Sequence, residues 1–264
     1  MIELEDDAFH FVHRGSVRKA NVLNTGAAYF NRFWYADPRG VWSESSVRNE
    51  TFVADEVPTK WASGFARRMR KWYVQPRQSR HAQPKSKQSF SEGHVAVFLQ
   101  GRATSLRWSR YVEELDMVRA LQDVVGDREI LIKEHPKRTD EDTLRAMKFL
   151  ARKDHRIKFV DANVHDLLKS SAVCCSTSSG VSMEAILHKC PVMLFGKADF
   201  HHVAATVQNS DETEEAFRHA LQNEWAFDQY LYWFFRMQMV DSEVRPVLPQ
   251  VIEKSVFLSD MVVL

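Results

Sequence analysis

The sequence predicts an α/β protein with a doubly wound parallel sheet of the Rossmann type. Short runs of strand character alternate with segments of helical periodicity over residues 94–210, the pattern of consecutive βαβ units. Two polar turns, LIKEHP and CCSTSSG, directly follow strand-like runs, as is typical of the ligand-binding edge of such a sheet. The alternation and the place of these turns together favour a fold built around a buried parallel sheet.

The alternation can be followed along the chain. Runs rich in Val, Ile, Leu and Phe predict strands at 94–100, 129–133, 157–160, 172–176 and 191–196. Apolar residues at helical spacing predict helices at 109–125, 139–153, 164–171 and 180–189. From residue 211 onward we expect mostly helix, with the aromatic-rich segment 226–240 packed against the sheet.

The chain divides at a polar, proline-punctuated segment that we interpret as a linker. Ahead of it, FHFVHRG and NRFWYADPRG read as strands that run into turns, and TKWASGFARRMRKWYV reads as a helix. These elements are too few for a complete Rossmann sheet. The predicted organisation is a reduced or incomplete N-terminal region (1–75), a linker (76–93), a Rossmann-like domain (94–210) and a C-terminal helical region (211–264).

Composition excludes several classes of protein. The 264 residues carry a formal net charge of +1, so we expect no nucleic-acid partner. Three cysteines do not make a disulfide framework, and no apolar run approaches the roughly 20 residues of a membrane span, so we expect a cytoplasmic chain. His201 and His202 are adjacent but lack a third ligand at a convincing spacing, so no metal is expected.

Basic residues concentrate around the predicted linker. No Asp or Glu occurs between Val57 and Ser91. The same stretch contains Arg67, Arg68, Arg70, Lys71, Arg77, Arg80, Lys85 and Lys87. We expect the segment from Arg67 to Lys87 to be exposed and poorly ordered, because it has few apolar anchors. Its charge is either simply solvated or faces an anionic membrane surface, which would make the protein peripheral on the inner membrane face.

Two turns at the predicted carboxyl edge carry side chains suited to chemistry. His135 follows a buried-type strand in LIKEHPKRTD, and four hydroxyl residues precede a helix in SAVCCSTSSG. A helix N-terminus offers unpaired N–H groups and a partial positive charge, which suits a phosphate. Ser and Thr are also good helix N-caps, so the serine turn is either a phosphate site or only a cap. His135 is likewise either a structural hydrogen-bonding residue or part of that site.

The two turns resemble motifs of the capsule polysaccharide biosynthesis proteins, which include the bacterial β-Kdo transferases. That family has a strand ending in K-x-H-P and, further along, an S-T-x-G-x-E-A-L-like turn and helix; LIKEHP and STSSGVSMEAIL occupy those places here. Aligned on Glu184, Ser179 takes the place of the motif serine and Gly180 that of the threonine. WYADPRGVWSESSV resembles the family's D-x-x-G-V-x-x-x-S segment and VFLQ its P-L-Q strand, so the resemblance spans roughly residues 30–205.

The resemblance implies a GT-B-like glycosyltransferase, in which two Rossmann-like domains face each other across a cleft and the C-terminal domain holds the donor nucleotide. It implies a CMP-activated, Kdo-like sugar as donor substrate, a glycan or glycolipid acceptor, and no separate cofactor. His135 would be the catalytic residue that contacts or protonates the leaving phosphate. The nucleotide-binding and phosphate-binding residues would be Lys133, Ser178, Ser179, Gly180 and Glu184. Glu184 either binds ribose hydroxyls or packs against a neighbouring loop.

Two departures from the family pattern leave the function open. The loop after LQ has Thr104 where the family carries an acidic residue, and the nearest downstream acids are Glu113, Glu114 and Asp116. The N-terminal region (1–75) is also short for an acceptor-binding domain. Besides a glycosyltransferase, the sequence therefore allows a CDP-glycerol-type polyol-phosphate transferase, or a non-catalytic sugar-nucleotide-binding or assembly subunit.

Overall fold

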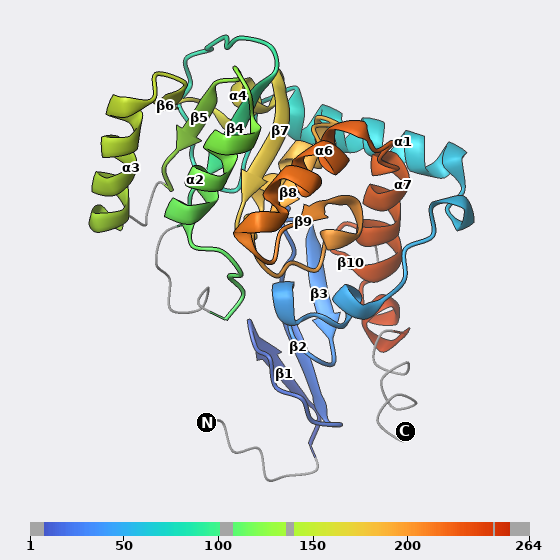
Figure 1. Ribbon diagram of the computed structural model, residues 1–264. Coiled ribbons are helices and arrows are strands. Elements are labelled where there is room, and N and C mark those ends of the chain that lie inside the picture. The colour runs from blue at the N-terminus through green and yellow to red at the C-terminus, as the bar shows by residue number, and fades with distance from the viewer. Residues whose placement is uncertain (1–7, 101–107, 136–139, 245, 254–264) are drawn as a thin grey trace.

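The computed structural model describes residues 8–100, 108–135, 140–244 and 246–253, which contain two β-sheets (Figure 1). The larger sheet has six strands in the order β6-β5-β4-β7-β8-β9. They are Ile157–Phe159 (β6), Ile130–Lys133 (β5), His94–Phe98 (β4), Ser171–Ser176 (β7), Val192–Leu194 (β8) and Ala205–Thr206 (β9). Every neighbouring pair runs parallel, which confirms the predicted α/β fold class.

Helices cover both faces of this sheet because side chains alternate along each strand. In β4, Val95 and Val97 enter one core, while Ala96 and Phe98 enter another. The first core is closed by α2 (Glu114–Val124), α3 (Glu141–Lys153) and α6 (Thr213–Gln222). The second is closed by α4 (Val164–Leu168) and α5 (Val181–Leu187).

The smaller sheet joins the two ends of the chain. Its order is β1-β2-β3-β10, from strands His10–His13 (β1), Val22–Ala27 (β2), Phe33–Asp37 (β3) and Val240–Asp241 (β10). β1 and β2 are parallel, and the other two pairings are antiparallel. Strands β1 and β3 fall within runs that the sequence predicts, whereas β2, β9 and β10 were not predicted.

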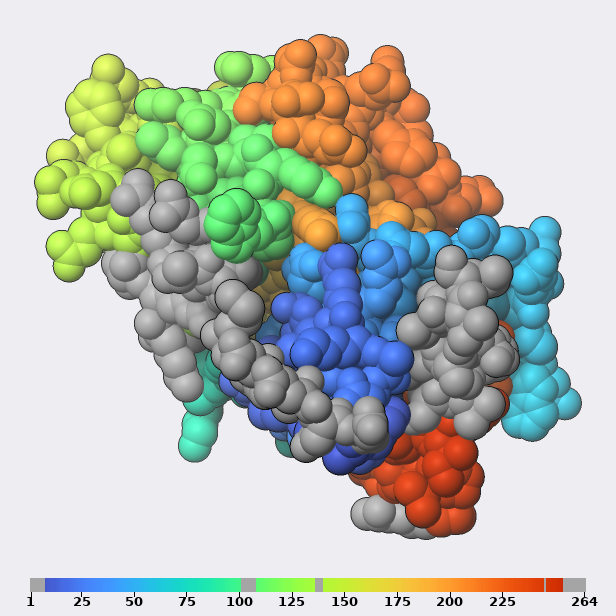
Figure 2. All heavy atoms as spheres, turned by 90° about the horizontal axis from the view of Figure 1, so that it is seen from below, coloured from blue at the N-terminus to red at the C-terminus, as the bar shows by residue number. Residues whose placement is uncertain are grey.

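The smaller sheet, β1-β2-β3-β10, is called the front sheet below. It shares one core with the second face of the large sheet, the face covered by α4 and α5. Helix α1 (Thr59–Met69) packs along α7 (Phe227–Tyr232), and each continues as a π-helical turn, Arg70–Val74 and Trp233–Gln238. Rings from both ends of the chain meet there: the centroids of Phe33 and Phe235 are 4.7 Å apart. Tyr230, Phe234 and Phe235 are fully buried, which confirms that the aromatic-rich segment is core. In Figure 2 the front sheet, in blue, has the C-terminal segment, in red, beside it.

The segment that resembles D-x-x-G-V-x-x-x-S is a turn organised by the buried carboxylate of Asp37. This carboxylate accepts hydrogen bonds from the backbone N–H groups of Arg39, Gly40 and Ser46 and from the hydroxyls of Ser45 and Ser46. The motif therefore specifies a loop conformation in this chain. Short 3-10 helices span Trp42–Glu44, Ser46–Asn49, Ala54–Glu56, His201–Val203 and Ser210–Glu212. Among the described residues, no helix is both long and apolar enough to cross a membrane.

The expectation of a solvated, poorly ordered segment from Arg67 to Lys87 is wrong in part. Its first residues belong to α1 and the π-helical turn. The Arg70 guanidinium donates to Asp228 at 2.5 Å and to the Leu187 carbonyl at 2.7 Å. Arg77 donates to Asp166 at 2.6 Å. These partners lie far away in the sequence, so composition alone does not reveal them. The remaining basic side chains of the stretch are exposed: Arg67, Arg68, Lys71, Arg80, Lys85 and Lys87.

Candidate nucleotide site at the carboxyl edge of the large sheet

The carboxyl ends of three central strands meet at one edge of the large sheet. Phe98 of β4 pairs with Lys133 of β5 on one side and with Ser176 of β7 on the other. His135 lies two residues after the end of β5 at Lys133, and Ser179 lies three residues after the end of β7 at Ser176. The parallel strands thus bring the histidine turn and the serine turn to the same edge, on either side of β4. That both side chains reach one phosphate stays a prediction.

The serine turn is held by hydrogen bonds from its own backbone. The Ser178 N–H donates to Oε1 of Gln100 at 2.6 Å, and the Ser179 N–H donates to Oγ of Ser176 at 3.1 Å. The Ser179 Oγ accepts from the Val181 N–H at 3.4 Å, a long cap-like hydrogen bond to the first residue of α5 from the residue before the N-cap Gly180. Because a capping hydroxyl uses a lone pair, its O–H can still donate to a ligand. Capping and phosphate binding are therefore compatible at Ser179.

Gln100 also lies at this edge. In the sequence it stands out only as the last residue of the strand motif VFLQ. Its side chain fixes Ser178, and its own N–H donates to Oε1 of Glu114 at 2.5 Å. Both Gln100 and Glu114 are buried. A glutamine directly after a fully buried strand is the signal that could have marked it, because a buried amide needs hydrogen-bond partners.

The three acids that follow the loop after Gln100 in the sequence each have a partner in the structure. Glu114 accepts from the Gln100 N–H, Glu113 from Arg110, and Asp116 from Arg119. Thr104, where the family carries an acid, lies outside the described residues. Within the described ranges, none of these three acids presents an unengaged carboxylate at the edge.

The linker closes the side of this edge next to β5. The ring of His81 packs edge to face on the ring of His135, with centroids 5.6 Å apart. Lys133 is nearly buried, and its Nζ lies 3.5 Å from Oδ1 of the exposed Asp161. The side chain of His135 is therefore positioned by a residue of the linker, a contact that the sequence analysis did not anticipate.

Glu184 also contacts the linker. Its carboxyl is buried and accepts a hydrogen bond from the Ser79 hydroxyl. Burial raises the pKa of Glu184 to about 8, which favours the protonated form of the carboxyl at neutral pH. Of the two roles that the sequence allows for Glu184, the structure contains the packing contact with a neighbouring loop. Ribose binding by this residue stays a prediction.

Two histidines beside Glu184 fasten the linker to α4 and α5. His165 Nε2 lies 2.9 Å from the Gln78 carbonyl, so it donates there, and its Nδ1 accepts from His188 Nε2 at 2.9 Å. Burial lowers the pKa of both rings, that of His188 to about 4. His165 Nε2 is also 3.4 Å from the Glu184 carboxyl, and burial shifts the pKa of each group toward its neutral form, which disfavours an ion pair between them.

The front sheet packs directly beside the serine turn. A Cβ placed on Gly180 would lie 3.1 Å from Cδ1 of Tyr29, so Gly180 gives Tyr29 room to approach α5. Asp199, in the loop after β8, accepts hydrogen bonds from the hydroxyls of Tyr29 at 2.5 Å and Tyr35 at 2.6 Å. Burial raises the pKa of Asp199 to about 7. This cluster fixes the front sheet against the large sheet close to the predicted phosphate site.

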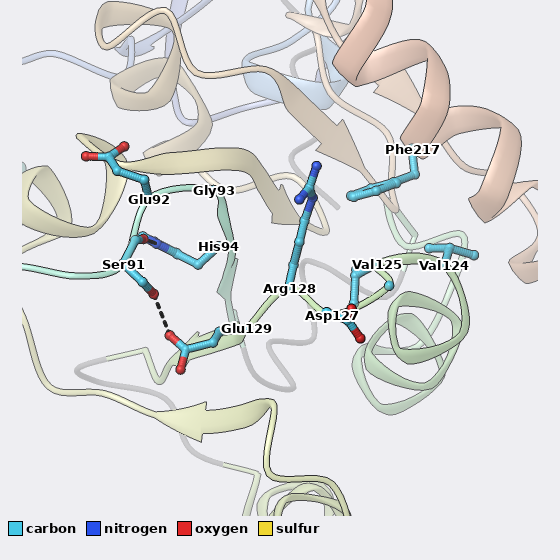
Figure 3. A pocket seen from close by; sticks show the side chains of 11 residues that line it. Ser91, Glu92, Gly93, His94, Val124, Val125, Asp127, Arg128, Glu129 and Phe217 are labelled. Atoms are coloured by element: carbon cyan, nitrogen blue, oxygen red, sulfur yellow. Dashed lines mark hydrogen bonds between the residues drawn. The ribbon is translucent and has the colours of Figure 1, made fainter.

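A large hollow lies at the opposite, amino-terminal edge of the sheet (Figure 3). It has a volume of about 680 Å³ and is lined by residues 91–94 before β4 and 126–129 before β5. A hydrogen bond of 2.7 Å from Ser91 to Glu129 crosses its rim. Since ligands of parallel sheets bind at the carboxyl edge, this hollow does not serve as the nucleotide site in our interpretation.

The histidine pair His201 and His202 contacts the backbone of the N-terminal region. Each Nε2 lies within hydrogen-bond distance of a backbone carbonyl, 3.0 Å from that of Arg48 and 2.9 Å from that of Glu50. Within the described ranges, no three His, Cys, Asp or Glu side chains are grouped as metal ligands. Both histidines thereby hold the loop after β8 against the N-terminal region, at Arg48 and Glu50.

Comparison with solved structures identifies the class of fold. KpsC beta Kdo 2,7 transferase of Thermosulfurimonas dismutans superimposes with a TM-score of 0.54 at 12% identity, covering 92% of this chain and 79% of that one. The beta Kdo 2,4 transferase of the same KpsC gives 0.49 at 15%, covering 79% and 70%. UDP-GlcNAc 2-epimerase of Methanocaldococcus jannaschii gives 0.40 at 15%, covering 56% of this chain and 46% of that one. The chain thus spans less than half of that epimerase. The likeness to the beta Kdo 2,7 transferase, at 12% identity, shows the fold alone.

A family model matches part of the chain. Residues 113–242 match the family model described as capsule polysaccharide biosynthesis protein. This match places that segment in the capsule polysaccharide biosynthesis family and confirms the resemblance seen in the sequence. A search of curated protein sequences finds no match.

Proposed function

We propose that this protein is a glycosyltransferase of capsule or related surface polysaccharide synthesis. In this proposal it transfers a Kdo-like sugar from a CMP-activated donor to a glycan or glycolipid acceptor. The observation that carries the proposal is the placement of His135 and the serine turn on either side of β4, at the carboxyl edge of a parallel sheet. The family match over residues 113–242 supports it, as does the fold shared with a protein named a beta Kdo transferase.

The proposed chemistry assigns a role to each side of the edge. The hydroxyls of Ser178 and Ser179 donate hydrogen bonds to the phosphate of the bound nucleotide, near the start of α5. The acceptor hydroxyl attacks the anomeric carbon and releases its proton to water. The bond between that carbon and the phosphate oxygen breaks, and its electron pair leaves with the phosphate. His135 contacts or protonates the departing phosphate, so that CMP leaves with its new negative charge stabilised. Lys133 adds a positive charge at the end of β5.

A calorimetric screen of CMP, CDP, UDP and GDP tests the donor class. Tightest binding of CMP is expected. Preference for UDP or GDP contradicts the CMP-sugar assignment. A CDP-glycerol-type polyol-phosphate transferase also binds cytidine nucleotides, so analysis of the product formed from CMP-Kdo or CDP-glycerol separates the two enzymes.

One observation favours a second candidate, a non-catalytic sugar-nucleotide-binding or assembly subunit. The three acids nearest to the position of Thr104 are engaged with other groups, so the described residues supply no evident base for the acceptor hydroxyl. Labelled CMP-Kdo distinguishes the candidates: release of CMP and transfer of the label support an enzyme. Binding without turnover, in the presence of an acceptor extract, supports the subunit.

We also propose that an anionic membrane surface is a partner of this chain. The exposed basic residues of the segment from Arg67 to Lys87 would each add on the order of 1 kcal/mol to binding near anionic lipid. Sedimentation with vesicles of phosphatidylglycerol should capture the protein at low salt, whereas phosphatidylcholine vesicles should not. Equal capture by both, or none by either, contradicts the proposal.

A further inference from the structure

The linker that leads into β4 is fastened to the large sheet at three consecutive residues. The Arg77 guanidinium pairs with Asp166 of α4 at 2.6 Å. The Gln78 carbonyl accepts from His165 Nε2 at 2.9 Å, and the Ser79 hydroxyl donates to the buried carboxyl of α5. A polar segment of this composition is typically solvated, yet these contacts hold its backbone in one place beside α4 and α5.

These anchors fix the position of His81, which follows the last of them by two residues. On its other side the Gln83 amide donates to the His81 carbonyl at 3.3 Å. The Asn163 amide, which precedes α4, donates to the Pro84 carbonyl at 3.4 Å. The backbone that carries the His81 ring is therefore held on both sides of it.

The linker brings the His81 ring to the carboxyl edge of the large sheet, onto the ring of His135. The two ring centroids are 5.6 Å apart and the ring planes are inclined at 72°. Both side chains are partly exposed, so a ligand at this edge can reach them. A neutral imidazole has one N–H donor and a protonated one has two. The edge thus presents two histidine donors where the strand motif LIKEHP marks only one.

The spacing of the two rings suits a phosphate. An N–H···O bond joins heavy atoms about 2.7–3.2 Å apart, so two donors on one phosphate group lie roughly 4–6 Å from each other. The ring separation of 5.6 Å falls in this range. A phosphate has several charged oxygens and accepts strong hydrogen bonds from both rings at once.

We propose that His81 is a second histidine that contacts the phosphate of the bound nucleotide, together with His135. This proposal rests on the proposed function and adds a residue to its site. His81 donates one N–H to a phosphate oxygen, and no covalent bond to it forms or breaks. Proton transfer to the departing phosphate stays with His135. The linker is accordingly a wall of the nucleotide site as well as a connection between two parts of the chain.

Calorimetric titration of CMP and of cytidine, which lacks the phosphate, tests this role on the full chain. His81→Phe retains an aromatic ring to pack on His135 but has no N–H, whereas His81→Ala loses both. The matched control His155→Phe makes the same substitution at an exposed histidine in the loop before β6, at the opposite edge of the sheet. CMP should bind both His81 variants roughly ten- to a hundredfold more weakly than it binds the wild type and His155→Phe. The affinity for cytidine should stay within about twofold in all four proteins.

The outcomes separate this role from packing and from the proposed function. If His81→Phe binds CMP as the wild type does, direct contact is refuted. In that case a loss confined to His81→Ala makes His81 a positioning residue for His135. An equal loss of CMP and cytidine affinity also overturns the proposal, because the phosphate is then not what His81 recognises. If CMP fails to bind the wild type, the proposed function fails and this role with it.

A second measurement does not depend on the folding of His81→Phe. In the wild type labelled with 15N-histidine, the imidazole nitrogen resonances of His81 are assigned by their loss in His81→Ala. They should shift when CMP is added and stay in place when cytidine is added. Resonances that CMP leaves unmoved, while it binds, would refute the contact.

Discussion

Asp199 joins the front strands to the loop after β8, and its burial should make the protein less stable as the pH rises. Its carboxyl accepts from the hydroxyls of Tyr29 and Tyr35, and burial raises its pKa from 3.8 to about 7. Below pH 4 both the folded and the unfolded chains are protonated there, so this contribution to stability is fully present. Between about pH 4 and 7 only the unfolded chain releases the proton. The free energy of unfolding should therefore fall by on the order of 4 kcal/mol over that window.

Urea denaturation followed by tryptophan fluorescence, from pH 4.5 to 8, measures this effect. Asp199→Asn removes the titration but retains one acceptor and one donor for the two tyrosine hydroxyls. Glu184, whose pKa is also raised, titrates in both proteins and cancels in the comparison. The free energy of unfolding of the wild type, relative to that of Asp199→Asn, should fall steadily as the pH rises to about 7. Parallel curves for the two proteins would show that Asp199 is not held neutral by its burial, and would refute the reasoning.

Other predictions concern packing and ion pairing. Arg70→Met leaves the partly buried Asp228 without its charge partner and should lower the free energy of unfolding by about 1–3 kcal/mol; an unchanged urea midpoint would contradict the assigned contact. Gly196→Ala places a Cβ 2.5 Å from the Ser109 carbonyl oxygen and should destabilise the fold by more than about 1 kcal/mol. The control is Gly64→Ala in α1, where the added Cβ would meet no atom closer than 3.8 Å. This variant should instead stabilise the fold by about 0.5–1 kcal/mol. Equal melting temperatures for the two glycine variants would contradict both assignments.

The large sheet could be predicted because its signal is local. The strands from β4 to β8 lie in short runs that are mostly apolar, and each run is followed by a helix or a polar turn. Strands β9 and β10 have only two residues each, too short for periodicity to register. β2, with the sequence VLNTGA, includes Asn and Gly, which are depleted in strands, and pairs with β1 only in the folded chain.

The candidate site could be predicted only where a motif marks it. His135 and Ser179 stand within three residues of the ends of strand-like runs, so their shared edge follows from parallel topology. The contributions of the linker could not be predicted, because its polar composition is also typical of a solvated segment. The contacts of Ser79 with Glu184 and of His81 with His135 join residues far apart in sequence, and only tertiary packing brings them together.

The central claim is that the serine turn binds the phosphate of a cytidine nucleotide. Calorimetric titration of CMP into wild type, Ser179→Ala and the exposed control Ser210→Ala tests it most directly, with thermal melts of all three proteins without ligand. Loss of a hydrogen bond to a charged oxygen costs about 1.5–3 kcal/mol, so CMP should bind Ser179→Ala roughly ten- to a hundredfold more weakly. Its melting temperature should fall only slightly, because the cap to the Val181 N–H is long, at 3.4 Å. A lower melting temperature with unchanged CMP affinity would contradict the account and leave Ser179 as a helix cap alone.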